Sequence, residues 1–132
     1  MEKREEINNI LKNGEEIIRE RRIAGGEIYL TNERIITNRI SLMKKISLSS
    51  KASFSSIPLS DIVSCRIASG IPLFSLPRLI VTYKERERKR EVFFEFTNKE
   101  ELKDFFQGFC NTFDKKLSAD VFSTTGYGII IN

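Results

Sequence analysis

The sequence predicts a mainly β domain that ends in an amphipathic α-helix and is preceded by a short helix. Segments rich in β-branched and aromatic residues recur between short polar turns from residue 15 to residue 97, as expected of antiparallel strands. After residue 98 the apolar residues change to helical spacing. With 132 residues, 40% of them hydrophobic and 30% charged, the chain is long enough to bury a core of its own.

Three parts are expected along the chain. They are an N-terminal helical extension (1–13), the main domain (14–117) and a β-prone C-terminal tail (118–132). In the extension, Ile7, Ile10 and Leu11 fall on one helical face, and Asn13-Gly14 is a typical helix stop. In the tail, residues 129–131 are three isoleucines with high β propensity and no charge. The tail is therefore expected either to add to a sheet edge of its own domain or to pair with a neighbouring subunit.

The main domain begins with three predicted strands. The first covers residues 15–24, and its imperfect alternation indicates either an edge strand or a β-bulge. Gly25-Gly26 follows as a tight turn, because glycine adopts positive φ without steric cost. The next two strands lie within 28–31 and 35–37, separated by a polar turn that contains Asn32.

The middle of the chain is less regular. Residues 39–56 are expected to form a serine-rich connection or a ragged pair of strands. A better alternating strand is predicted over 57–67, with Pro58 at its start or on a sheet edge. Its apolar face is expected to carry Val63, Cys65 and Ile67. Cys65 is then a small buried hydrophobic residue.

The two clearest strands are 78–83 and 91–97, joined by a highly charged hairpin tip at 84–90. Before them, the loop 68–77 contains two prolines and four large apolar residues. These apolar residues either cover an open end of the core or form a patch that binds a partner.

The C-terminal helix has the strongest local signals. Asn98 is a suitable N-cap, and Glu101 follows three residues later, as in a capping box. One wide stripe of the helix holds Leu102, Phe105, Phe106, Phe109, Cys110 and Phe113. Such a stripe must pack on a large apolar surface. The open mouth of a curved antiparallel sheet is the surface that we expect.

Three segments in this order carry a resemblance to a known family. They are 26–36 (GEIYLTNERII), 57–62 (IPLSDI) and 93–98 (FFEFTN), the last running into the helix. Together they resemble the PH-like domain superfamily, in particular the GRAM and bacterial PH-domain families, over about residues 14–116. The resemblance implies a PH-like barrel of about seven antiparallel strands in two nearly orthogonal sheets, with one open end plugged by the C-terminal helix.

The resemblance also implies a non-enzymatic scaffold that binds phosphoinositides, other anionic lipids or protein partners. In PH domains, basic residues around the first hairpin contribute to the phosphate site. The corresponding turn of this chain, Ala24-Gly25-Gly26, carries no lysine or arginine. Any anion site must therefore use the loops that follow.

Two segments concentrate positive charge on a chain of net charge +4. No acidic residue lies between Glu33 and Asp61, and the second segment is the hairpin tip at 84–90, where basic residues alternate with glutamates. The candidate residues for binding an anionic ligand are Arg39, Lys44, Lys45, Lys51, Lys84, Arg86, Arg88, Lys89 and Arg90. The PH-like topology places both segments at the same end of the barrel, whereas a simple solvated hairpin is the alternative for the second.

We therefore expect a binding module that docks to anionic lipid head groups or a membrane surface through basic loops. The alternative is a protein-interaction or homo-oligomer assembly module that uses the 68–77 loop or the C-terminal tail. Nucleic acid is a less expected partner, because aromatic residues do not interleave with the basic ones.

An enzyme is not expected. The chain has no histidine and no glycine-rich phosphate loop, so neither a metal nor a cofactor is expected. Two cysteines make neither a disulfide framework nor a metal cluster. Without a secretory signal or an apolar run of roughly 20 residues, the expected location is cytoplasmic, peripheral to the membrane.

Overall fold

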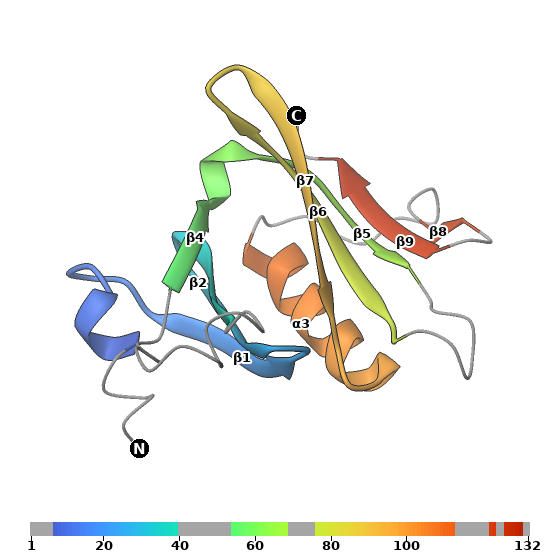
Figure 1. Ribbon diagram of the computed structural model, residues 1–132, viewed down its shortest axis with the longest axis horizontal. Coiled ribbons are helices and arrows are strands. Elements are labelled where there is room, and N and C mark those ends of the chain that lie inside the picture. Colours follow the sequence, from blue (N-terminus) through green and yellow to red (C-terminus); the bar gives the residue numbers. More distant parts are fainter. Residues whose placement is uncertain (1–6, 40–53, 69–75, 113–121, 124–125, 131–132) are drawn as a thin grey trace, which may run out of the picture.

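The computed structural model describes residues 7–39, 54–68, 76–112, 122–123 and 126–130, and the chain is mainly β (Figure 1). It contains two antiparallel sheets, a C-terminal helix and a short helical segment at residues 7–10. The predicted balance of strand and helix is therefore confirmed. The predicted PH-like barrel of about seven strands stays a prediction, because the two sheets form separate hydrogen-bonded ladders of four and five strands.

The first sheet, sheet A, contains the three strands predicted at the start of the main domain and a fourth strand that spans the boundary between the predicted segments 39–56 and 57–67. They are β1 (Ile17–Ile23), β2 (Gly26–Thr31), β3 (Arg34–Arg39) and β4 (Phe54–Pro58), in the order β1-β2-β3-β4. The predicted glycine turn is confirmed, since Gly25 has a φ of +87° between β1 and β2. The irregular alternation of β1 has both expected causes, because β1 is an edge strand and its register shifts between Ile17 and Arg19.

The second sheet, sheet B, follows a short 3-10 turn, η1 (Leu59–Asp61). Its strands are β5 (Ile62–Ala68), β6 (Arg78–Glu85), β7 (Arg88–Glu95), β8 (Phe122–Ser123) and β9 (Gly126–Ile130), in the order β7-β6-β5-β9-β8. The prediction of a single strand over 57–67 is wrong, because η1 interrupts it and takes the chain from sheet A to sheet B. Pro58 lies at the end of β4, which is an edge strand as expected.

A register shift corrects the predicted apolar face of β5. The shift lies between Ile62 and Ser64, so the simple alternation does not hold across Val63. Ile62, rather than Val63, joins Cys65 and Ile67 in the main core. Cys65 is fully buried, as predicted.

The C-terminal tail pairs within the same chain. β9 is antiparallel to β5, from Ser64 opposite Ile130 to Ala68 opposite Gly126. Of the two predicted roles, the tail therefore adopts the first in this structure and adds to a sheet of its own domain. The predicted apolar loop 68–77 falls mostly outside the described residues, since only Ala68, at the end of β5, and Leu76 and Pro77 are described.

The helix α3 (Lys99–Thr112) fills the space between the two sheets. Its start is capped as predicted, because Asn98 Oδ1 accepts a hydrogen bond of 2.8 Å from the Glu101 N–H. The predicted stripe is confirmed for Leu102, Phe105, Phe106, Phe109 and Cys110, all of them buried, and Phe113 lies outside the described residues. These side chains share one core with residues of both sheets, among them Leu30 and Val81.

The N-terminal helical segment packs on the other side of sheet A. Ile7 is fully buried in a small cluster with Tyr29 and Ile36. Its predicted C-terminus at Asn13 is wrong, because the helical residues end at Ile10. Gly14 does adopt a positive φ of 85°, but in the turn that follows.

A buried ion pair ties this segment to sheet A. Both nitrogens of an Arg34 fork donate to the Glu15 carboxylate, at 2.9 and 3.0 Å, and the Glu15 side chain is fully buried. Thr31 Oγ1 and the Lys12 N–H also donate to this carboxylate, and Arg34 Nη2 donates to the Ile10 carbonyl. Arg34 belongs to the acid-free basic segment of the sequence, but this pairing removes it from any anion site.

The same network sets the acidity of Glu15. Burial by itself raises the pKa of Glu15, but hydrogen bonds from Arg34, Thr31 and Lys12 and the charge of Arg34 lower it from 4.5 to about 2. A carboxylate whose pKa is lower in the folded state stabilises the fold above its unfolded pKa. That contribution is lost as the pH falls toward 2.

We predict that Glu15→Gln destabilises the protein at neutral pH by about 3–5 kcal/mol, because it leaves the Arg34 charge without its partner. The difference from the wild type should shrink by on the order of 3 kcal/mol between pH 5 and pH 2, where Glu15 itself becomes protonated. Urea unfolding of both proteins across this pH range measures the effect. Parallel pH profiles would contradict the assignment.

Candidate functional site

The β6–β7 hairpin is the most exposed charged element of the described chain. The two strands pair from Arg78 opposite Glu95 to Glu85 opposite Arg88, and Arg86 and Glu87 form the turn. Their φ angles are +50° and +69°. Two positive φ angles are typical of a type I′ turn, which matches the twist of a hairpin but favours Asn and Gly. Arg86 and Glu87 therefore hold a strained backbone at the tip.

The hairpin gathers five of the nine predicted site residues. Every residue from position 84 to position 91 is exposed, and the hairpin extends away from α3 at the top of Figure 1. Its basic residues are Lys84, Arg86, Arg88, Lys89 and Arg90. Within the described part of the chain, only Arg90 has a carboxylate within 4.0 Å, that of Glu85 at 3.4 Å. Four cations of the tip are thus available to an external anion.

Arg39 lies away from the hairpin tip. Its Cζ is 4.8 Å from the centroid of the Phe94 ring, and its Nη1 donates to the Phe93 carbonyl at 3.3 Å. Phe94 is six residues along β7 from Arg88, which is roughly 20 Å at about 3.3 Å per residue. The structure does not bring Arg39 to the hairpin tip, contrary to the expected placement at one end.

The remaining predicted residues, Lys44, Lys45 and Lys51, lie outside the described residues. The flanks of their segment are Arg39 and Phe54, at one end of the β3–β4 pair. The opposite end of β4 faces the hairpin, because Pro58 and the β6–β7 turn line the same cavity.

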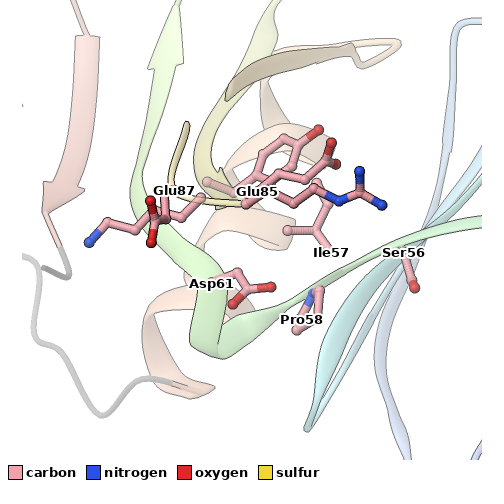
Figure 2. A pocket seen from close by; sticks show the side chains of 9 residues that line it. Ser56, Ile57, Pro58, Asp61, Glu85 and Glu87 are labelled. Carbon is pink, nitrogen blue, oxygen red and sulfur yellow. The ribbon is translucent and has the colours of Figure 1, made fainter. Parts of the chain in front are cut away.

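This cavity was not predicted from the sequence. It has a volume of about 350 Å³ and lies between the hairpin tip and the end of β4 with η1 (Figure 2). Its lining residues are Ser56, Ile57, Pro58, Asp61, Tyr83, Lys84, Glu85, Arg86 and Glu87. Figure 2 shows Asp61 and Pro58 on one wall, with Glu85 and Glu87 from the hairpin opposite. With three carboxylates and two cations, the lining does not select an anion.

Sequence reasoning also missed the exposure of two large apolar side chains. Phe93 is 47% exposed and Leu76 is 41% exposed, whereas their neighbours Phe94 and Leu79 are buried. The alternation around Phe93 is the signal that was available, since Val92 and Phe94 cannot share its face in a regular strand.

The two cysteines have no place in a reactive site. Both are free and fully buried in the main core. Burial raises the pKa of the Cys65 thiol well above its usual value, and it raises the pKa of Cys110 to about 11. Both thiols are therefore core residues, as predicted, and poor nucleophiles.

Two further findings concern the described residues alone. They contain no group of three or more His, Cys, Asp or Glu side chains arranged to hold a metal ion. They also contain no helix that is long and apolar enough to cross a membrane.

Comparison with known proteins gives no match: no family model, no curated protein and no solved structure matches this chain. The function is therefore inferred from the charges and exposed surfaces of the chain itself.

We predict that replacing Arg86-Glu87 by Asn-Gly stabilises the protein by about 1–2 kcal/mol, because both new residues tolerate positive φ. The gain should appear as a higher urea midpoint with an unchanged slope. Arg86→Asn alone should give only part of it. A double variant no more stable than the wild type would show that the turn carries no strain.

Proposed function

We propose that this chain is a non-enzymatic, PH-like binding module that docks to anionic lipid head groups at a membrane surface, with the β6–β7 hairpin as its contact. The single observation behind this proposal is the set of four exposed cations at the tip that have no carboxylate within 4.0 Å among the described residues, namely Lys84, Arg86, Arg88 and Lys89. Basic residues near an anionic bilayer contribute about 1 kcal/mol each. A peripheral location on the cytoplasmic side of a membrane follows from this proposal.

The order of elements supports the PH-like part of the proposal. Four strands of sheet A are followed by β5, β6 and β7 and then by α3, whose apolar stripe lies between the sheets. The sheets also approach each other at one edge, where Ile23 forms a bridge with Phe96 and the Ala24 N–H donates to the Glu95 carbonyl at 2.9 Å. In the proposed PH-like barrel, this contact and η1 are the two places where the sheets join.

Assembly through the tail is the competing function. β9 already occupies an edge of β5 in the same chain, so exchange between subunits requires this pairing to break. No contact among the described residues favours exchange, and the lipid-binding function is therefore preferred.

We predict that the wild-type protein cosediments with vesicles of phosphatidylcholine and phosphatidylserine at low salt and less so at high salt. Arg86→Glu/Lys89→Glu should weaken this binding at least about tenfold, because it replaces two attractive charges by repulsive ones. The vesicle concentration at half-maximal sedimentation measures the effect.

The control is Lys12→Glu/Arg22→Glu, which makes the same charge change at two exposed positions outside sheet B. It should retain most of the binding. Equal losses in both double variants would show that only net charge matters. Equal sedimentation of the wild type with pure phosphatidylcholine vesicles would overturn the function, and a preference for duplex DNA over vesicles would replace it.

A further inference from the structure

The β6–β7 pair has two chemically different faces. Leu79, Val81 and Phe94 are buried in the main core, and they define the inner face. Residues at alternate positions point the other way. This outer face consists of Arg78, Ile80, Thr82 and Lys84 on β6, Lys89, Glu91, Phe93 and Glu95 on β7, and Arg66 beside them on β5.

The outer face carries an exposed aromatic ring. Phe93 is 47% exposed, and the guanidinium carbon of Arg78 lies 5.0 Å from the centroid of its ring. Leu76, the other large exposed apolar residue among those described, precedes Arg78 by two positions. An apolar ring beside a cation is suited to the boundary between lipid head groups and acyl chains, because the ring can enter the acyl region while the guanidinium stays among the head groups.

The charges of the outer face are unbalanced at one end. Lys84 and Lys89 lie directly opposite each other in the antiparallel register, and like charges in this position repel. Neither lysine has a carboxylate within 4.0 Å in the described part of the chain, since the two glutamates of this face pair elsewhere. Glu91 lies 3.4 Å from Arg66, and Glu95 lies 4.0 Å from Arg78. An external phosphate between the two ammonium groups would relieve the repulsion.

The lysine pair and the Phe93 ring lie close enough on one face to contact the same surface. Lys89 and Phe93 lie on the same strand and the same face, four residues apart, which is roughly 13 Å at about 3.3 Å per residue. A flat anionic bilayer can therefore meet the lysine pair and the phenylalanine together. A contact through the hairpin tip alone leaves Phe93 in water.

We propose that the outer face of β6 and β7 lies flat on an anionic membrane, with head-group phosphates at Lys84 and Lys89 and the Phe93 ring inserted as an anchor. This inference rests on the proposed function and names the surface and orientation that serve it. The charge of the face decides for lipid as the occupant. Among the described residues, its two unpaired charged groups, Lys84 and Lys89, are both cationic, and its one large exposed apolar side chain is Phe93, with Leu76 nearby and Ile80 half-buried.

The chain contains no tryptophan, so Phe93→Trp introduces a single selective fluorophore on the proposed surface. Gln107→Trp is the matched control, at an exposed position of α3, which packs on the inner side of the sheet. With phosphatidylcholine–phosphatidylserine vesicles, we expect the emission of Trp at position 93 to shift to shorter wavelength and to be quenched by brominated lipid. Emission from position 107 should not change.

Cosedimentation of the same samples separates the two proposals. If both variants bind vesicles and position 93 shows no shift or quenching, the orientation is wrong and the lipid-binding function stands. If neither variant nor the wild type binds, the function itself is wrong.

Phe93→Ala should in addition weaken vesicle binding about tenfold, whereas Phe93→Leu should retain most of it. Equal binding by Phe93→Ala and the wild type would overturn the anchor.

Discussion

The apolar stripe of α3 is the contact on which the rest of the structure depends. Phe105 and Phe109 are fully buried among side chains of both sheets, and the ring of Phe105 lies 5.5 Å from that of Phe96. Arg21 of β1 adds an ion pair to Glu101 at 2.6 Å and a second to Asp104, which fix the start of the helix against the edge of sheet A. Without this helix, the inner faces of the two sheets would be exposed to water.

The same contact decides which surfaces remain for function. It commits the inner face of β6 and β7 to the core, so the outer face and the tip of this hairpin lie outside that core. The tip extends beyond the part of the sheet that α3 covers, which explains why its residues are all exposed. Charge then distinguishes the two ends of the outer face, with Lys84 and Lys89 at one and Phe93 with Arg78 at the other.

Local patterns were sufficient to predict most of the elements. The glycine turn, the Asn98 cap and the phenylalanine stripe follow from backbone preference and periodicity over a few residues, and all three are confirmed. The break at η1 was missed because residues 57–67 read as one strand, and only the change of sheet requires a corner there. The shift beside Val63 was missed for a related reason, since a bulge depends on the partner strand.

The candidate site was harder to predict, because it depends on which strand ends meet. The basic residues at 84–90 are close in sequence and stay together on the hairpin. Arg39 was expected to join them, but the direction of β3 places it beside Phe93 and Phe94 instead. Local patterns also do not predict the pairing of Arg34 with Glu15, since the two residues are 19 positions apart. The PH-like resemblance and the lipid partner stay predictions.

Paramagnetic broadening of backbone amide signals tests the central claim most directly. The protein would be bound to anionic nanodiscs that carry a spin label on the lipid head group. Our account predicts broadening along the whole of β6 and β7, from the Lys84–Lys89 pair to Phe93, with little effect on β2 or α3. Broadening confined to the turn at Arg86 and Glu87, or strongest in sheet A, would contradict it.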